Sequence, residues 1–203
     1  VILFDVGGVL LTNGWDTGER ALAVVHFQLD EAGFEARHRE AYPAWERGAV
    51  AVETYLDAVV FNEARGFSHE EFFAFMVAQS QLLPDGALGT LKELAASKEC
   101  GLGKCMLGAL NNEARETNEY RFKKFGLRNY FQVALSSCSL GVRKPEMGIY
   151  QRALDVLGRP AERILFIDDR AENVAAAVGA GMRGLHFAGE EGLRRELAGL
   201  GVL

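Results

Sequence analysis

The sequence has few cysteines, no long apolar run and no excess of positive charge, and each scarcity excludes a class of protein. Three cysteines are an odd number, which does not suggest a disulfide framework, and Cys100 and Cys105 lack the spacing and the nearby histidine of a zinc site. No apolar stretch approaches the ~20 residues that a membrane-spanning helix needs. The net charge of −6 leaves no basic field for nucleic acid. We therefore expect no membrane and no nucleic-acid partner, and free thiols without a secretory pattern favour a cytoplasmic protein.

The first ten residues contain the clearest structural signal. Residues 1–4 form a short apolar run that stops at Asp5 and is followed by Gly7 and Gly8, a pattern typical of a buried strand. From Pro84 onward, further apolar runs alternate with helical segments, and these runs lie at 105–110, 131–135, 164–167 and 184–187. This alternation predicts an α/β fold with a parallel, Rossmann-like sheet whose strand carboxyl ends meet at one edge.

Residues 14–83 interrupt this alternation with helical patterns alone. One predicted helix runs from Asp30 to about Ala41 and is broken by Pro43. A segment of this length inside a compact domain must have a structure of its own. The sequence predicts an α/β core made of residues 1–13 and 84–203, with residues 14–83 forming a small helical cap inserted after the first strand.

Polar side chains follow the predicted strands and collect at one edge of the sheet. These are Asp5, Asn111 with Asn112, Ser136 with Ser137, and Asp168 with Asp169, and Lys144 lies on a loop nearby. Converging carboxylates repel one another unless a cation intervenes, and Mg²⁺ prefers such oxygen ligands. Lysine and amide donors suit an anion, and the whole set suits phosphoryl transfer. The sequence therefore predicts a magnesium-dependent site for a small phosphorylated substrate.

Four segments resemble the four motifs of the haloacid dehalogenase superfamily across the whole chain. They are residues 3–10, 108–112, 141–146 and 166–169. The sequence is most similar to the small-capped phosphatases, such as the glucose-1-phosphate phosphatases and the phosphatase domain of soluble epoxide hydrolases. The resemblance implies an enzyme of the phosphoric monoester hydrolase type.

The resemblance also implies roles for individual residues. Asp5 would be the nucleophile that forms an aspartyl-phosphate, and Lys144 would neutralise the nucleophile and the phosphate. Mg²⁺ would bind the Asp5 carboxylate, the Gly7 carbonyl, Asp169 and, directly or through water, Asp168. The phosphate would also meet Gly7, Gly8, Asn111 and Asn112.

Two positions depart from the family pattern. Gly7 stands where the family's phosphatases usually carry an aspartate that acts as general acid and base, and such help is typically worth about 10²–10⁴-fold. Asn111 stands where they usually offer Ser or Thr, although its amide can still donate a hydrogen bond. We expect a preference for good leaving groups, such as acyl, aryl or anomeric phosphates. In the cap, His38, Tyr42 and Trp45 are candidate proton donors.

Two alternatives remain open from the sequence. A haloacid dehalogenase shares the aspartate nucleophile and the lysine but needs no metal, and adjacent acids such as Asp168 and Asp169 do not belong to it. A non-catalytic or weakly catalytic protein that binds a phosphorylated ligand or another protein would explain the departures at Gly7 and Asn111. The sequence is compatible with a monomer or a homodimer, and it does not identify the substrate.

Overall fold

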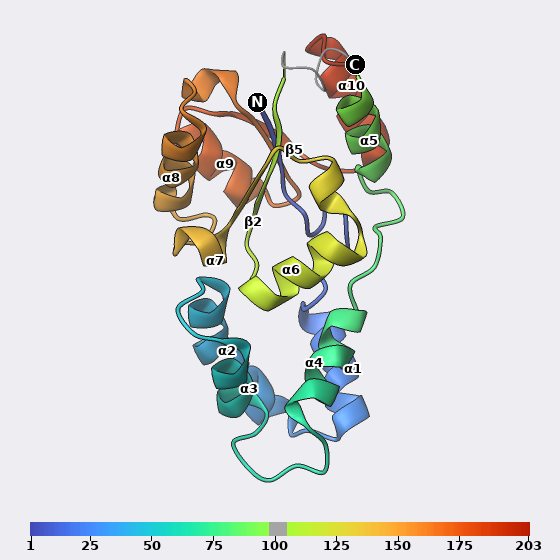
Figure 1. Cartoon of the computed structure of the whole chain (residues 1–203), viewed down its shortest axis with the longest axis vertical. Coiled ribbons are helices and arrows are strands. Elements are labelled where there is room, and N and C mark those ends of the chain that lie inside the picture. Colours follow the sequence, from blue (N-terminus) through green and yellow to red (C-terminus); the bar gives the residue numbers. More distant parts are fainter. Residues whose placement is uncertain (98–104) are drawn as a thin grey trace.

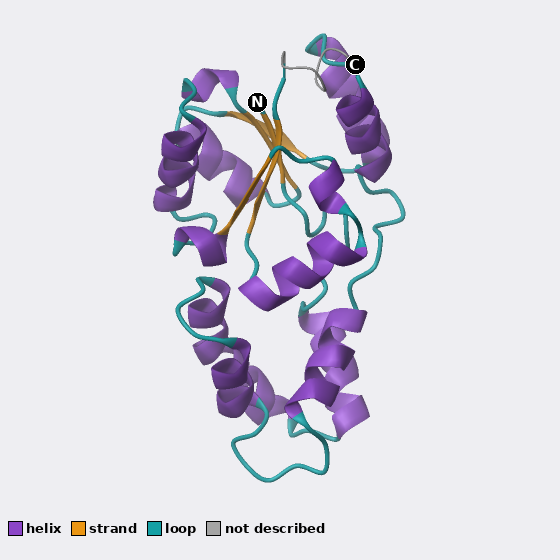
Figure 2. Ribbon diagram, in the orientation of Figure 1, coloured by secondary structure: helices purple, strands orange, loops and turns teal. Residues whose placement is uncertain are grey.

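The computed structural model describes residues 1–97 and 105–203, so Cys100 lies outside the described residues. A five-stranded parallel sheet has the strand order β3-β2-β1-β4-β5. Figures 1 and 2 show its twisted strands between two groups of helices. The strands are β1 (Ile2–Phe4), β2 (Leu107–Asn111), β3 (Val133–Ser136), β4 (Leu165–Asp168) and β5 (Arg183–His186). The predicted α/β class with a Rossmann-like parallel sheet is confirmed.

The two faces of the sheet bury separate apolar clusters. Ile2 and Phe4 of β1 point into one cluster, and Leu3 between them points into the other, as the two-residue period of a strand requires. The first cluster contains side chains of α5 (Leu88–Ala96), α6 (Arg115–Lys124) and α10 (Glu190–Gly199). The second contains side chains of α8 (Met147–Leu157) and α9 (Ala171–Gly179). Because both faces are covered, all three residues of β1 are buried.

The helices between β1 and α5 form a separate layer, which with their loops (residues 14–83) we call the helical insert. Its helices are α1 (Thr17–Phe27), α2 (Glu31–Glu46), α3 (Val52–Val59) and α4 (His69–Ala78). Capping boxes begin two of them, with Asp16 and Glu19 at α1 and Ser68 and Glu71 at α4. The insert has its own aromatic core, and it lies beyond the carboxyl ends of the strands in Figure 1.

Several predicted boundaries were wrong, among them the start of the run at 105–110, which is a strand only from Leu107. Helix α2 continues through Pro43 to Glu46, because Pro43 lies in the last turn and its carbonyl still accepts from the Arg47 amide at 3.2 Å. The strand expected to begin at Phe131 begins at Val133, after the short 3-10 turn Leu127–Asn129. A four-residue helix, α7 (Ser137–Leu140), follows that strand without a loop and had no periodic signal in the sequence.

Helix α6 holds both connections between the sheet and the helical insert. Arg121 donates to the carbonyl oxygens of Thr12 at 2.5 Å and Asn13 at 3.3 Å, on the outgoing connection. Lys124 donates to the carbonyl of Ser80 at 2.9 Å, on the returning connection. The insert is therefore anchored at the edge where the strands end. None of the described helices has the length and apolarity that a membrane span needs.

Candidate active site

Asp5 lies at the centre of the site because it directly follows the central strand β1. Its amide donates to the Ile167 carbonyl at 2.8 Å, which ties the end of β1 to β4. Its Oδ1 accepts from the Val6 amide at 2.7 Å, and its Oδ2 lies 2.9 Å from the Lys144 ammonium. Asp5 is only 8% exposed, yet it contributes to the wall of a cavity.

Lys144 reaches this carboxylate from the loop before α8. Its ammonium lies 2.6 Å from Asp168 Oδ2 as well as 2.9 Å from Asp5, so one buried cation bridges the ends of β1 and β4. Asn112 fixes the lysine backbone on both sides. The Asn112 side-chain Nδ2 donates to the Lys144 backbone carbonyl at 2.9 Å, and the Lys144 backbone amide donates to Asn112 Oδ1 at 2.8 Å. Asn112 therefore positions Lys144, a contact that the sequence did not reveal.

Asp168 and Asp169 are adjacent but have different surroundings. Asp168 is fully buried and accepts from Lys144, from the Arg170 amide and from the side-chain amide of Asn173. Asp169 Oδ1 is buried without a hydrogen-bond partner in the described part of the chain, and the carboxylate packs against Gly8 mainly through its other oxygen, Oδ2. Asp168 thus organises the site, whereas Asp169 has an unused ligand atom.

Gly8 is required by this packing. Its φ is +70°, and a Cβ there would overlap the Asp169 carboxylate. Gly158 has a similar φ of +58° but open space around the same position, so it provides a matched control. We expect Gly158→Ala to lower the free energy of unfolding by about 1 kcal/mol through backbone strain. Gly8→Ala should cost about 1–3 kcal/mol more through overpacking and should displace Asp169. Urea denaturation of both variants checks this, and equal losses would contradict the contact.

The carboxylates fit a divalent cation. Asp5, Asp168 and Asp169 each offer an oxygen, and these atoms all lie within 4.8 Å of one another. The unpartnered Asp169 oxygen is an independent sign, because buried polar atoms in proteins are usually hydrogen-bonded and this oxygen, unlike Glu46 Oε2, has no ion-pair partner among the described residues either. An all-oxygen set of this kind suits Mg²⁺, which binds through one or two carboxylates and a phosphate oxygen.

Burial perturbs the ionisation of this cluster. Burial raises the pKa of Asp5 to about 7. The ammonium of Lys144 lowers this pKa in part, and the negative charge of Asp168 raises it further. Burial and the Asp168 charge also raise the pKa of Asp169. Burial alone would lower the pKa of Lys144, but the charges of Asp5 and Asp168 outweigh it and raise that pKa. A bound cation would favour the ionised carboxylates.

This ionisation predicts a pH-dependent response to magnesium. Between about pH 4 and pH 7 the folded protein keeps a proton on Asp5 that the unfolded chain has lost. The binding of this proton stabilises the folded state, and its contribution to the free energy of unfolding is lost as the pH rises through about 7. Mg²⁺ must displace that proton. We expect excess MgCl₂ to raise the melting temperature clearly at about pH 8 and little at about pH 5.

Asp169→Asn should remove most of this magnesium response. Asp85→Asn, which changes an exposed aspartate, should keep it. Differential scanning fluorimetry with and without MgCl₂ measures both variants. A magnesium response of equal size at both pH values would contradict the role of Asp5.

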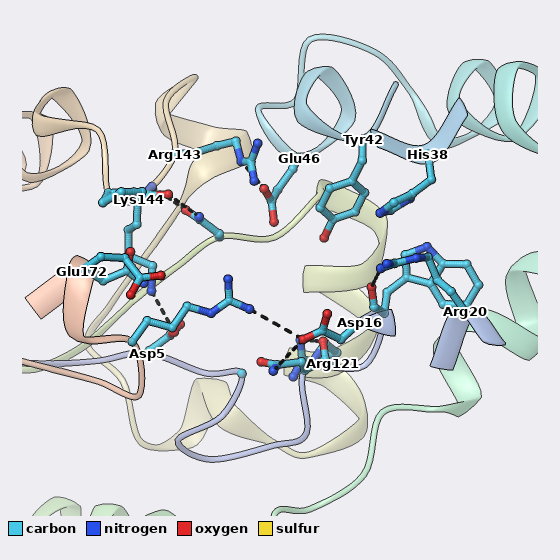
Figure 3. A pocket seen from close by; sticks show the side chains of 17 residues that line it. Asp5, Asp16, Arg20, His38, Tyr42, Glu46, Arg121, Arg143, Lys144 and Glu172 are labelled. Atoms are coloured by element: carbon cyan, nitrogen blue, oxygen red, sulfur yellow. Dashed lines mark hydrogen bonds and ion pairs between the residues drawn. The ribbon is translucent and has the colours of Figure 1, made fainter. Parts of the chain in front are cut away.

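A cavity of about 330 Å³ opens from this cluster toward the helical insert. Figure 3 shows Asp5 and Lys144 at one side of it and His38, Tyr42 and Glu46 of α2 at another. The insert also contributes Trp15, Asp16 and Arg20, and the sheet domain contributes Gly7, Asn112, Arg121, Arg143 and Arg170, among others. The arginines and Glu46 were missed from the sequence because their contribution depends on how the insert packs.

Not every predicted residue lies in the cavity wall. Asn111 is buried, donates to Asn118 Oδ1 at 3.0 Å and is not among the lining residues, and its own Oδ1 has no partner. Trp45 is also buried outside the wall, where its indole donates to Glu116 at 3.0 Å. Gly7 lines the cavity, and a Cβ there would lie 2.7 Å from Asn13 Oδ1.

The other two candidate proton donors of the insert have pKa values shifted away from neutrality. Burial and the nearby Arg20 charge lower the pKa of His38 to about 4, so the imidazole is neutral at pH 7. Burial and the Glu46 charge raise the pKa of Tyr42 well above its usual value, and the phenol is hydrogen-bonded to Glu46. A general acid needs a pKa nearer the working pH.

Comparison with known proteins places this arrangement in a family. The profile of the haloacid dehalogenase-like hydrolases matches residues 1–181. The chain belongs to the haloacid dehalogenase-like hydrolases. As a member of this family it is an enzyme, and the family resemblance predicted from the four motifs is confirmed.

Relatives of this hydrolase include phosphatases. The sesquiterpene phosphatase astK of Aspergillus oryzae is 27% identical over 187 residues, which cover 91% of this chain and 88% of that protein. Drimenol cyclase drtB of Aspergillus calidoustus is 25% identical over 98% of this chain, and the chain spans 36% of that longer protein.

Solved structures share the fold of this hydrolase. The magnesium complex of a HAD family enzyme from Bacteroides thetaiotaomicron superposes with a TM-score of 0.72 at 19% identity, covering 92% of this chain and 91% of that one. An L-2-haloacid dehalogenase superposes with a TM-score of 0.63 at 21% identity, covering 93% of this chain and 84% of that one. These similarities establish the fold, and the chemistry must be argued from the site.

Proposed function

We propose that this hydrolase is a magnesium-dependent phosphatase that cleaves a small phosphate monoester through a phosphorylated Asp5. The observation that carries the proposal is the buried Lys144 ammonium, 2.9 Å from Asp5 and 2.6 Å from Asp168, beside the unpartnered oxygen of Asp169. The similarity to a sesquiterpene phosphatase over most of both chains supports it.

In the proposed reaction Asp5 attacks and is later released. A carboxylate oxygen of Asp5 forms a bond to phosphorus while the bond from phosphorus to the ester oxygen breaks, and the leaving oxygen takes a proton from water. A second water then attacks the acyl phosphate, which frees Asp5 and inorganic phosphate. Lys144 balances the negative charge near the reacting atoms, and Asn112 keeps it in place.

The residues that would hold the metal are Asp5, Asp169, Asp168 and the carbonyl of Gly7. When bound there, Mg²⁺ supplies positive charge that neutralises the phosphate oxygens. Asp168 is saturated by Lys144, Arg170 and Asn173, so we propose that it acts mainly by orienting Lys144 and, through water, the metal.

The missing acid at position 7 predicts a strong dependence on the leaving group. Neither His38 nor Tyr42 has a pKa near neutrality that suits a proton donor, so an ester with a low leaving-group pKa should react fastest. We expect kcat for aryl phosphates to exceed that for alkyl phosphates by about 10²-fold or more, within the range that general acid catalysis supplies.

The test is a series of phenyl, p-nitrophenyl and alkyl phosphates, measured with MgCl₂ and after EDTA treatment. We expect activity to require MgCl₂ and to rise as the leaving group improves. Full activity after EDTA treatment would contradict the magnesium role, and equal rates for aryl and alkyl esters would show that a proton donor exists.

Two other functions are distinguished by simple assays. A 2-haloacid dehalogenase would release chloride from a 2-haloacid without metal, whereas Asp168 and Asp169 together favour a metal site. A binding protein without turnover would be stabilised by beryllofluoride or phosphate and would hydrolyse no ester, a possibility that Gly7 and Asn111 favour. We propose the phosphatase because the nucleophile, the lysine and the unsatisfied metal ligand lie together.

We further propose that the helical insert, residues 14–83, acts as a cap over the core formed by 1–13 and 84–203. Its separate aromatic core and its contribution to the cavity wall support this. The cytoplasmic location and the monomeric or homodimeric state stay sequence-based predictions.

A further inference from the structure

Several arginines line the cavity, but each of them is paired with a carboxylate. Four arginines line it beyond Lys144, namely Arg20, Arg121, Arg143 and Arg170. Its volume of about 330 Å³ is at the lower end of small-molecule sites, which leaves little room beyond the phosphoryl group. An arginine without a carboxylate partner could bind a negatively charged leaving group. The ion pairs of these four arginines therefore decide whether a charged or an uncharged leaving group fits.

Arg20 is committed to the insert itself. Its Nε lies 2.7 Å from one oxygen of Glu35 and its Nη2 lies 3.1 Å from the other, a two-pronged ion pair. Its Nη1 donates to the Trp15 carbonyl at 2.9 Å, and the residue is 8% exposed. A substrate anion would have to compete with the partly exposed Glu35 carboxylate for this guanidinium.

Arg121 and Arg143 are committed in the same way. Arg121 forms a buried ion pair with Glu113 and also donates to two backbone carbonyls of the outgoing connection. Arg143 forms an ion pair with Glu46, whose carboxylate is almost fully buried. Figure 3 shows Arg143 and Glu46 facing each other across the top of the cavity. Neither cation has net charge left for a ligand.

Arg170 at the rim is outnumbered by acids. It is half-exposed and lies 3.7 Å from Asp16, a distance that marks a weak pair. Asp16 and Glu172 both line the same cavity, so the rim carries two carboxylates against one guanidinium. A second anionic group on the substrate would meet this surplus of negative charge.

His38 is the remaining neutral donor on the insert side, and its orientation is fixed. The Trp15 indole can only donate, and it donates to the Tyr55 hydroxyl at 3.0 Å. His38 Nδ1 lies 2.8 Å from the same hydroxyl. The hydroxyl can donate its proton to Nδ1 when the imidazole carries its own proton on Nε2, so this contact favours the Nε2–H tautomer. His38 lines the cavity, and among the described residues Nε2 has no protein partner.

We propose that the insert selects phosphate monoesters whose leaving group is small, polar and uncharged, and that the Nε2–H of His38 donates a hydrogen bond to an oxygen of that group. Tyr55 is the positioning residue that holds this tautomer. The proposal rests on the proposed function in one respect, because it places the phosphoryl group at Asp5 and Lys144.

The test compares esters that differ only in charge. Glycerol phosphate and phosphoglycerate share a three-carbon skeleton. Glycerol phosphate carries a neutral hydroxymethyl group where phosphoglycerate carries a carboxylate. The Asp5→Asn variant removes the nucleophile, so isothermal titration calorimetry with MgCl₂ can measure binding without turnover. We expect glycerol phosphate to bind at least tenfold more tightly than phosphoglycerate. Equal affinities or the reverse order would overturn the selection of uncharged groups.

His38 and Tyr55 are tested in the same background. His38→Phe should weaken glycerol phosphate about tenfold, the effect of one lost hydrogen bond of ~1.4 kcal/mol, while the affinity for inorganic phosphate stays within about twofold. Nitrogen-detected NMR should show His38 as the Nε2–H tautomer at neutral pH, and Tyr55→Phe should give a mixture of tautomers. A dominant Nδ1–H tautomer, or equal losses for both ligands in His38→Phe, would overturn the role of His38.

Turnover by the wild-type protein separates this inference from the proposed function. If the wild type hydrolyses esters but the affinity order is reversed, the inference fails and the phosphatase proposal stands. If the affinity order holds in Asp5→Asn but the wild type hydrolyses no ester, the phosphatase proposal fails and the selection of uncharged ligands stands. If inorganic phosphate binds and neither ester does, the inference is overturned.

Discussion

Asp5→Asn should abolish phosphatase turnover while leaving the fold intact. The substitution keeps the size of the side chain and its hydrogen-bond capacity, but an amide oxygen is a poor nucleophile. We expect kcat to fall by roughly 10⁴-fold or more, the scale found when the nucleophile of a covalent mechanism is removed. The buried position loses a carboxylate whose pKa is already raised to about 7, so stability should change little near neutral pH.

The measurement is steady-state hydrolysis of p-nitrophenyl phosphate, with mass spectrometry of the acid-quenched wild type. The wild type should carry one phosphoryl group on the peptide that contains Asp5, and the variant should carry none. Asp155→Asn changes an exposed aspartate on α8 and should keep full activity. If Asp5→Asn retained more than a tenth of the wild-type rate, or if the phosphoryl group were found on another residue, the nucleophile would be misassigned.

Lys144→Met should destabilise the protein more than any other single change considered. The Lys144 side chain is 1% exposed and its ammonium is the shared partner of two buried carboxylates, so its removal leaves Asp5 and Asp168 without this cation. Breaking a buried ion pair from one side costs about 3–5 kcal/mol. Methionine preserves the length and apolar stem of lysine, which separates the loss of charge from the loss of packing.

Urea denaturation measures this loss, and Lys123→Met on the exposed side of α6 is the control. We expect Lys123→Met to change the free energy of unfolding by less than about 0.5 kcal/mol. MgCl₂ should restore part of the stability of Lys144→Met, because a cation between the carboxylates replaces some of the lost charge. A loss below about 1 kcal/mol for Lys144→Met would show that this lysine does not balance the buried acids.

The sequence predicted the acidic half of the site well for a physical reason. Asp5, Asp168 and Asp169 directly follow apolar runs, and parallel strands bring their carboxyl ends to one edge whatever the details of packing. Lys144 was found through its motif, and the structure places its ammonium between the two carboxylates. The order of strands and helices in the core followed from the same alternation.

The insert side of the cavity could not be predicted in this way. The pairing of Arg20 with Glu35 joins α1 to α2, and the contact of His38 with Tyr55 joins α2 to α3. Helix periodicity predicts which residues are buried but not which helix they meet. Asn112 was expected to bind phosphate, and its bonds to the Lys144 backbone depend on a loop conformation that no sequence pattern encodes.

The anchoring of both connections on α6 has a consequence for how the helical insert can move. Thr12 and Ser80 border the helical insert at opposite ends of its sequence, yet Arg121 and Lys124 of one helix hold them. A rotation of the whole insert relative to the sheet would strain both sets of hydrogen bonds at once, because both connections are bound to the same helix, α6. Among the cavity-lining arginines described above, Arg170 stands apart from this arrangement, because it is half-exposed and its single weak ion pair, with Asp16 at 3.7 Å, fixes neither connection.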